Sequence, residues 1–299
     1  MNKVDSVKLL IIKYIKELEN DFLDSFIKNY PFGKMLRSKI ILTIAPDSIH
    51  SIEACAIVEL IHFASLLHDD VLDNASTRRG IQSANSKYGN KNAIMIGDIL
   101  YSKAFYEISK IDGVLSQIIS NAVLKLSLGE LEDIHLSKEF NSNEEKYIKM
   151  IDYKTASIIE ASAEIAGILT NKNSSKYKIY GNSLGIAFQI IDDLLDITGD
   201  EKKLGKPAFS DFKEGKSTLP YIYLYHELSK NNKLTLLSLF KKDLNEENKA
   251  WILNMMNELN IINKTKEIAL HYGNKALQNL DSNDSKLVDI VKDMIFREF

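Results

Sequence analysis

The chain contains few of the residues that cross-link or interrupt a fold. Its 299 residues include one cysteine, four prolines and thirteen glycines. The single cysteine, Cys55, excludes an intramolecular disulfide framework and fits a reducing compartment, so we expect a cytoplasmic protein. Because proline and glycine are the residues that most often end helices, their scarcity favours long helices.

Neither net charge nor hydropathy indicates a nucleic-acid or membrane partner. The net charge is -3, whereas nucleic-acid binding normally needs a basic surface. We expect no signal peptide, because no apolar core precedes a small-residue cleavage site. The most apolar stretch, residues 52–67, is interrupted by Glu53, Glu59 and His62, so we expect no membrane span. Any anionic ligand must therefore be held by local cations or by metal.

Hydrophobic periodicity predicts helices along nearly the whole chain. Apolar residues recur every three or four positions in 4–28, 36–45, 50–73, 92–109, 114–137, 144–169, 174–197, 217–229 and pieces of 234–296. Ser142 and Glu145 have capping-box spacing at the start of the helix from about 144. No segment shows period-two alternation between turns, so strand content should be near nil. We expect one all-α domain over residues 1–299.

The motif Asp-Asp-x-Leu-Asp occurs twice, at 69–73 and 192–196. On a helix, Asp69 and Asp73 share one face, as do Asp192 and Asp196, while the second aspartate of each cluster points about 100° away. Each cluster follows an apolar run at the C-terminal end of its helix, where like-charge repulsion and the macrodipole both disfavour carboxylates. Such conflicts mark functional sites, and Mg²⁺ would relieve the repulsion.

One such motif alone would more often be a solvated acidic helix end, but two copies favour a metal site. An EF-hand is excluded because its Asp-x-Asp-x-Asp-Gly spacing is absent.

With these clusters, an ordered set of motifs resembles the all-trans polyprenyl diphosphate synthases, the family of farnesyl, geranylgeranyl and octaprenyl diphosphate synthases. The set covers most of the chain: Gly33-Lys34-Met35-Leu36-Arg37, the run from His62 to Asp73, Arg78-Arg79-Gly80, Gly97-Asp98, Gly129-Glu130, Lys154-Thr155-Ala156, the run from Phe188 to Asp196, Gly205-Lys206-Pro207, and Gly215-Lys216-Ser217-Thr218-Leu219-Pro220. The sequence departs from the family pattern at Met35, where a basic residue is usual, and at Ser38, where proline is usual.

The resemblance implies an antiparallel helical bundle around a central cavity, the isoprenoid synthase fold, in a homodimer. It implies a prenyltransferase that joins isopentenyl diphosphate to an allylic diphosphate, farnesyl or geranylgeranyl diphosphate, by magnesium-assisted ionisation, condensation and elimination. Three Mg²⁺ ions would be held by Asp69, Asp73 and Asp192, with Asp70, Asp193 and Asp196 in support.

The same resemblance divides the cationic and polar residues between two diphosphate sites. Isopentenyl diphosphate would be bound by Lys34, Arg37, His62 and Arg79. The allylic diphosphate would be bound by Arg78, Lys154, Thr155, Gln189, Lys206 and Lys216. Of these residues, Arg78 and Lys154 would act in catalysis with the three leading aspartates. The glycine-punctuated stretch 199–215 should form a lid over the phosphates.

Product length should depend on the helix turn before Asp69. Ala64 and Ser65 lie about 6–7.5 Å below that residue at 1.5 Å per residue, and both are small. Short-chain family members often carry a bulky aromatic residue at this level, so we predict a medium or long product, hexaprenyl to octaprenyl, with contact between the enzyme and the membrane surface during product release. The alternatives are a shorter-chain geranylgeranyl synthase, a class I terpene cyclase, and an inactive regulatory subunit.

Overall fold

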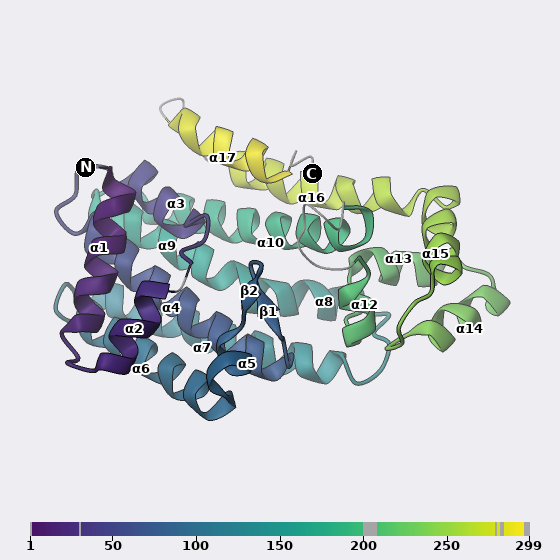
Figure 1. The fold of residues 1–299 in the computed structure, drawn as a ribbon. Coiled ribbons are helices and arrows are strands. Elements are labelled where there is room, and N and C mark those ends of the chain that lie inside the picture. The colour runs from purple at the N-terminus through teal and green to yellow at the C-terminus, as the bar shows by residue number, and fades with distance from the viewer. Residues whose placement is uncertain (1, 30, 200–207, 279, 282–283, 296–299) are drawn as a thin grey trace. The chain divides into compact units, whose positions relative to one another are not determined.

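The computed structural model describes all residues except 1, 30, 200–207, 279, 282–283, 296–299 and the side chain of Asn29 (Figure 1). Within the described residues the strands are limited to β1 (Thr77–Arg78) and β2 (Ile81–Gln82), which pair antiparallel, and helices form nearly all other regular structure. The all-α prediction is confirmed. The chain divides into a first unit, residues 1–124 with 158–181, and a second unit, residues 125–157 with 182–299. A single domain over 1–299 stays a prediction.

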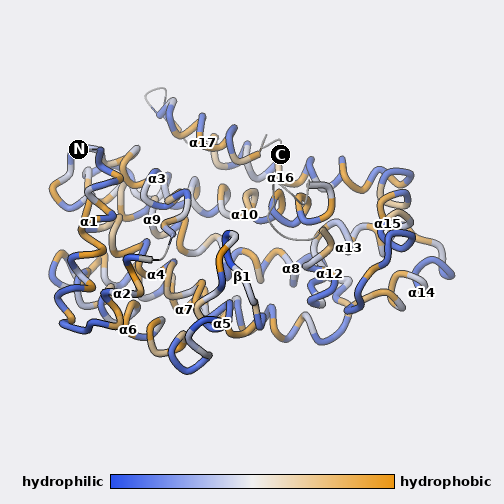
Figure 2. The backbone as a smooth tube through the Cα atoms, viewed as in Figure 1, coloured by the Kyte–Doolittle hydropathy of each residue, from blue (hydrophilic) through white to orange (hydrophobic). Residues whose placement is uncertain are grey.

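The first unit is organised around α4 (Ser51–Leu72), which packs along α6 (Asn90–Ser109) and also contacts α1, α3 and α5 (Figure 1). Its other helices are α1 (Lys3–Lys16), α2 (Asp21–Asn29), α3 (Leu36–Ile44), α5 (Ala84–Tyr88), the N-terminal half of α7 (Gly113–Leu136), nearly all of α9 (Ser157–Leu169) and the start of α10 (Ser174–Thr198). Hydrophobic and hydrophilic residues alternate along outer helices such as α1 (Figure 2), where Val7, Ile11 and Ile15 are buried.

Helix α4 is the one helix in the described part of the chain that is long and apolar enough to cross a membrane. However, 67% of its apolar window is buried inside the protein, as in the core helix of a globular domain. Its apolar character is therefore explained by packing against α6 and the other helices of the first unit.

The helix predicted over residues 4–28 is interrupted. Residues 17–20 separate α1 from α2, and Glu19 in this break has a left-handed backbone with φ 51°. Asn20 Oδ1 then accepts a hydrogen bond from Leu23 N at 3.1 Å, which caps the new helix. The hydrophobic pattern continues through the break, and for this reason periodicity alone did not reveal it.

The second unit contains the rest of α7 and α10. Its other elements are α8 (Glu144–Ile151), η1 (Asp152–Ala156), α12 (Ser210–Glu214), α13 (Leu219–Glu227), α14 (Lys230–Leu239), α15 (Glu246–Glu258), α16 (Ile261–Leu277) and α17 (Ser285–Ile295). Helix α13 contacts α8, α15 and α16, and α17 lies along α16 (Figure 1). One core cluster joins Tyr147 and Ile151 of α8 to Ile190 of α10 and Leu219 of α13.

The predicted helix 144–169 contains a feature that its hydrophobic pattern did not predict. Residues 152–156 form a π-helical turn, η1, between α8 and α9, and such turns occur frequently at functional sites. The helix also starts differently from the capping-box prediction. Asn143, not Ser142, is the N-cap, because its Oδ1 accepts a hydrogen bond from Lys146 N at 2.9 Å.

Candidate active site

The first aspartate cluster lies at the C-terminal end of α4, where the motif predicted it. Asp69 is half-buried, Asp73 is the exposed C-cap residue, and Asp70 is buried. Asp70 Oδ1 accepts a hydrogen bond from Arg78 Nε at 2.6 Å, while its Oδ2 is buried without a hydrogen-bond partner in the described part of the chain. Burial raises the pKa of Asp70, and the Arg78 guanidinium opposes that rise. The three carboxylates of this cluster therefore differ in their exposure to solvent.

A short hairpin holds the two adjacent arginines. Arg78 pairs with Ile81, and the turn residues Arg79 and Gly80 both have positive φ, 53° and 76°, as a type I′ turn requires. Arg79 Nη1 donates to Pro31 O at 3.0 Å. A Cβ on Gly33 would lie 2.4 Å from Arg79 Nη2, so only glycine at 33 permits this approach of the guanidinium.

Arg37 and the hairpin arginines surround His62 with positive charge. Burial lowers the pKa of His62 well below its usual value, and the positive charges of Arg37, Arg79 and Arg78 lower it further. Burial also lowers the pKa of Arg37 to about 10, against the opposing influence of Glu59. Arg37 Nε is buried with no hydrogen-bond partner among the described residues. Concentrated, under-satisfied positive charge of this kind is suited to an anion.

The departures from the family pattern, Met35 and Ser38, have a structural account. The Met35 side chain is buried, and its backbone is left-handed with φ 50° just before α3. Ser38 donates to Glu59 Oε1 twice, from its N at 3.1 Å and from its Oγ at 2.8 Å. A proline at 38 has neither an N–H nor a hydroxyl and could make neither bond. Lys34, at the entrance to this segment, is exposed.

The second aspartate cluster lies in the last two turns of α10. Asp192 is exposed, whereas Asp193 is buried and accepts two hydrogen bonds, from Tyr147 Oη at 2.6 Å and from Gln189 Nε2 at 2.7 Å. Gln189 Oε1 in turn accepts from Thr155 Oγ1 at 2.7 Å. Burial and the charge of Asp211 raise the pKa of Asp193 well above its usual value.

The third aspartate of this cluster, Asp196, is also buried. Its carboxylate accepts from Ser210 Oγ at 2.6 Å and from Asp211 N at 3.1 Å. Phe209 and Phe212, on either side, are buried as well. Residues 209–214, which we expected in a lid, are therefore anchored to the core by α12. Residues 200–207 of the expected lid, including Lys206, lie outside the described residues.

Lys154 belongs to the π turn and forms two ion pairs with α7. Its Nζ lies 2.8 Å from Glu130 Oε2 and 2.6 Å from Asp133 Oδ2, and both carboxylates are largely buried. Lys216, the other predicted lysine that the structure describes in this unit, is half-buried with its Nζ 2.7 Å from Glu214 Oε2. Lys154 and Lys216 are thus both held by carboxylates.

Two glycines permit close packing around the π turn. A Cβ on Gly129 of α7 would lie 2.3 Å from Lys154 N, and a Cβ on Gly185 of α10 would lie 2.5 Å from Ala156 Cα. Both obstacles are backbone atoms, which cannot move aside without shifting a helix. Glycine at these positions therefore lets α7 and α10 approach the π turn from two sides.

A family model described as polyprenyl synthetase matches residues 20–256. The chain belongs to the polyprenyl synthetase family. It is similar to a geranylgeranyl diphosphate synthase of Saccharolobus solfataricus, with 35% identity over 266 residues, 83% of this chain and 79% of the relative. The polyprenyl synthetase is accordingly a prenyltransferase of isoprenoid biosynthesis with trans-prenyl diphosphate synthase activity.

Solved structures agree with this assignment. An octaprenyl pyrophosphate synthase from Helicobacter pylori matches with a TM-score of 0.95 and 43% identity, covering 99% of this chain and 100% of that one. A polyprenyl synthase from Caulobacter crescentus CB15, complexed with calcium and isoprenyl diphosphate, matches with a TM-score of 0.91 and 26% identity, covering 99% and 94%. The predicted family and isoprenyl synthase fold are confirmed, while the individual site residues stay predictions.

The donor set of this polyprenyl synthetase fits Mg²⁺, the metal that the family uses. Among the described residues, no three His, Cys, Asp or Glu side chains form a preformed metal-ligand group. Of the six aspartates in the two clusters, Asp69, Asp73 and Asp192 have access to solvent. A few accessible carboxylates suit Mg²⁺, because it retains water and shares its coordination shell with phosphate oxygens rather than needing an all-protein cage.

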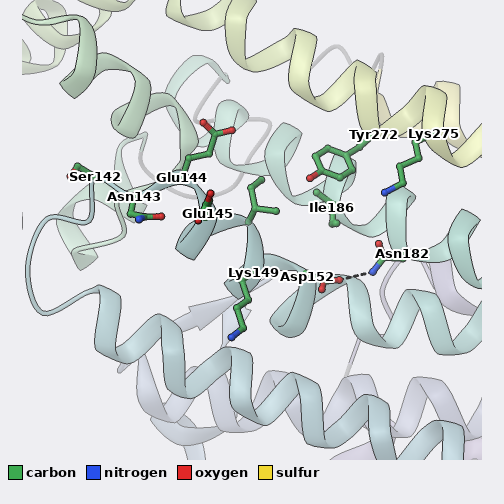
Figure 3. A pocket seen from close by; sticks show the side chains of 11 residues that line it. Ser142, Asn143, Glu144, Glu145, Lys149, Asp152, Asn182, Ile186, Tyr272 and Lys275 are labelled. Atoms are coloured by element: carbon green, nitrogen blue, oxygen red, sulfur yellow. Dashed lines mark hydrogen bonds between the residues drawn. The ribbon is translucent and has the colours of Figure 1, made fainter.

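The second unit also contains an open hollow of about 930 Å³ (Figure 3). Its lining comes from the start of α8, from α10 and from α16, and includes Glu145, Lys149 and Tyr272. On its wall, Asn182 Nδ2 donates to Asp152 Oδ1 at 2.5 Å. None of the predicted site residues in the described part of the chain lines it, so this hollow is separate from the candidate active site.

Several contacts of the predicted site residues were missed at the sequence level. Glu59, Asp133 and Tyr147 were not singled out, yet each contacts a predicted site residue or its neighbour. The spacing of Glu130 and Asp133, three apart on α7, was an available signal for a shared cation. Nothing in the local sequence marked Tyr147, whose partner is 46 residues away.

Proposed function

We propose that this polyprenyl synthetase condenses isopentenyl diphosphate with farnesyl or geranylgeranyl diphosphate to give a hexaprenyl to octaprenyl diphosphate. The observation that carries the proposal is the group of Arg37, Arg78 and Arg79 around His62, beside the first aspartate cluster. Three arginines exceed the nearby carboxylates Asp70 and Glu59 in charge, and such an excess suits a diphosphate. The neighbouring aspartates suit the metal that accompanies a diphosphate.

The division of roles follows from the surroundings of each residue. Arg37, His62 and Arg79, with Lys34, would bind the diphosphate of isopentenyl diphosphate. Lys154, Thr155, Gln189, Lys206 and Lys216, with Arg78, would bind the allylic diphosphate. For Lys154 the ion pairs with Glu130 and Asp133 hold its ammonium at a defined position before substrate arrives. Orientation of two anions and exclusion of water are what these residues contribute to the reaction.

Asp69, Asp73 and Asp192 would hold Mg²⁺, expected as three ions. When bound, Mg²⁺ would neutralise the departing diphosphate as a Lewis acid. The buried aspartates accept hydrogen bonds from the protein: Asp70 from Arg78, Asp193 from Tyr147 and Gln189, and Asp196 from Ser210 and Asp211 N. We assign them to the support of the accessible carboxylates.

Small residues support the longer product. Ala64 is fully buried and Ser65 nearly so, and the Ser65 hydroxyl turns back to His62 O at 2.9 Å. Neither side chain is large enough to close off a growing tail one turn before Asp69. A shorter geranylgeranyl product is the second candidate, because a relative at 35% identity is a geranylgeranyl diphosphate synthase. The six aspartates argue against an inactive subunit, and the second Asp-Asp-x-x-Asp argues against a terpene cyclase.

The test is incubation with Mg²⁺, isopentenyl diphosphate and farnesyl diphosphate, followed by mass measurement of the products. We expect hexaprenyl to octaprenyl diphosphate, and shorter products from Ala64→Tyr. A geranylgeranyl product from the unmodified protein would support the second candidate, and an unchanged product from Ala64→Tyr would reject the role of residue 64. Absence of any elongated product would reject the proposed reaction.

We also propose a homodimer formed through α7. Leu124, Leu128 and Leu131 follow one another at helical spacing and are roughly half-exposed in the single chain, with Ile134 one turn on. An apolar stripe of this kind on a helix surface is typical of a protein interface. Light scattering should give twice the chain mass, and Leu128→Glu should give the monomer. A monomeric unmodified protein would contradict the proposal.

A further inference from the structure

A hydrogen-bond chain joins the π turn to the second aspartate cluster, and it is buried at Tyr147 and Asp193 and half-buried at Thr155 and Gln189. Its donors and acceptors have one consistent direction: Thr155 Oγ1 donates to Gln189 Oε1 at 2.7 Å, and Gln189 Nε2 donates to Asp193 Oδ1 at 2.7 Å. From the other side, Tyr147 Oη donates to Asp193 Oδ2 at 2.6 Å. Reversal of the Gln189 amide would place its Oε1 against Asp193 Oδ1 and would turn the Thr155 hydroxyl from donor to acceptor, so the bond to Asp193 determines the direction of the chain.

Tyr147 is the fixed end of this chain. Its side chain is 1% exposed, and its ring packs in the core cluster with Ile151, Ile190 and Leu219. Packing of that kind leaves the ring one orientation, so the hydroxyl has one direction in which to donate. The bond is short, at 2.6 Å, and both of its groups are buried, so water cannot replace the tyrosine hydroxyl as a partner of Asp193.

The other end of the chain belongs to a segment with little freedom. Thr155 lies in the π turn, and Gly129 and Gly185 let α7 and α10 press against the same turn. The hydrogen-bond chain therefore connects two elements that carry predicted site residues, Thr155 on one and Gln189 and Asp192 on the other. A residue that fixes Asp193 thereby fixes the approach of both elements to a bound diphosphate.

We propose that Tyr147 is a positioning residue for the reaction: its hydroxyl sets Asp193 and, through Gln189, the direction of the Thr155 hydroxyl. This inference rests on the proposed function of the second aspartate cluster in binding the allylic diphosphate with Mg²⁺. Tyr147 itself is buried in the core and acts through Asp193 rather than on substrate.

The test compares Tyr147→Phe with Tyr221→Phe. Tyr221 lies in the same unit, is equally buried, and its hydroxyl has no hydrogen-bond partner in the described part of the chain. Both changes delete one buried hydroxyl and keep the ring. We expect Tyr147→Phe to lower kcat/KM for farnesyl diphosphate about 10- to 100-fold, because a buried carboxylate loses a donor. We expect Tyr221→Phe to retain the unmodified value within about twofold.

Two further readouts separate positioning from packing. Tyr147→Phe should raise the Mg²⁺ concentration for half-maximal activity several-fold and leave KM for isopentenyl diphosphate unchanged. It should also reduce the rise in melting temperature that Mg²⁺ with inorganic diphosphate gives the unmodified protein, a measurement that needs no turnover. If Tyr147→Phe and Tyr221→Phe lose equal activity, or if Tyr147→Phe keeps the unmodified Mg²⁺ requirement, the proposal is overturned.

A second variant covers failure of Tyr147→Phe to fold. Gln189→Leu removes the opposite donor to Asp193 at a half-buried position, and it should raise the Mg²⁺ requirement in the same direction. If Gln189→Leu needs the same Mg²⁺ concentration for half-maximal activity as the unmodified protein, the proposal is also overturned. The unmodified protein is assayed first: if it is inactive, the proposed function fails, whereas an active protein with an unaffected Tyr147→Phe variant rejects only this inference.

Discussion

Replacement of Arg78 by alanine should destabilise the first unit in a pH-dependent way. The guanidinium is the hydrogen-bond donor to Asp70 Oδ1, and the Asp70 side chain is 1% exposed while Arg78 is 27% exposed. Removing one partner of a buried pair costs about 3–5 kcal/mol, and the partial exposure of Arg78 reduces our expectation to roughly 2 kcal/mol. With about 2.1 cal/mol/K of unfolding entropy per residue, summed over the 299 residues of the chain, this corresponds to a loss of ~3 °C in Tm.

The pH dependence follows from the raised pKa of Asp70. Burial places that pKa above its unfolded value, so the folded protein retains the proton more strongly and Asp70 stabilises the fold most at low pH. This contribution is lost as pH rises from the unfolded pKa to the folded one. Without the opposing charge of Arg78 the folded pKa rises further. The loss of stability in Arg78→Ala should therefore be largest where Asp70 is ionised and should shrink as the pH falls through the folded pKa of Asp70.

Thermal melting of the unmodified protein, Arg78→Ala and Arg79→Ala at several pH values tests this reasoning. Arg79 is the matched control, because its guanidinium donates to a backbone carbonyl, Pro31 O, rather than to a carboxylate. Asp70→Asn in the Arg78→Ala background should recover part of the loss by removing the buried charge. An equal deficit at all pH values, or equal losses from Arg78→Ala and Arg79→Ala, would refute the argument.

Further predictions concern positions away from Arg78. Gly129→Ala places a Cβ against Lys154 N, so we expect a loss of about 1–3 kcal/mol in urea unfolding together with reduced activity; a variant as stable as the unmodified protein would contradict the close approach. Ser38→Pro, although it restores the usual family residue, removes both bonds to Glu59 and should lower stability by about 1–3 kcal/mol, whereas a stabilised variant would show that these bonds contribute little. Burial raises the pKa of Cys55 to about 12, so the folded protein should resist iodoacetamide at pH 8 and react after denaturation; rapid labelling of folded protein would contradict this.

The local sequence pattern was sufficient to predict features that depend on a single helix. The end of α4 at Leu72 and the aspartates at that end follow from an apolar run and its polar stop. The hairpin that carries Arg78 and Arg79 was missed because its strands have two residues each, too few for any alternation. The first long helix was predicted without its break, because the apolar spacing of α1 continues into α2 across residues 17–20.

The sequence pattern could not predict contacts between segments that are distant along the chain. Lys154 was expected to bind phosphate, and its ion pairs to Glu130 and Asp133 depend on how closely α7 approaches the π turn. Ser38 was read as a departure from the family, but its partner Glu59 is 21 residues away on another helix. Neither partner could be chosen from spacing, since many carboxylates occur at similar distances along the chain.

The aspartate clusters illustrate the division between the two kinds of information. Sequence alone determined that two Asp-Asp-x-Leu-Asp motifs lie at helix ends and predicted metal binding there, because carboxylate spacing and the surrounding motifs are local properties. The i,i+4 rule placed Asp192 and Asp196 on one helix face, and the family resemblance assigned the metal to Asp192 and a supporting role to Asp196. Only the tertiary structure shows how their surroundings differ: Ser210 and Asp211, which come after the end of α10, cover Asp196, while Asp192 remains exposed. Burial depends on neighbours brought in by folding, and a helical repeat carries no information about them.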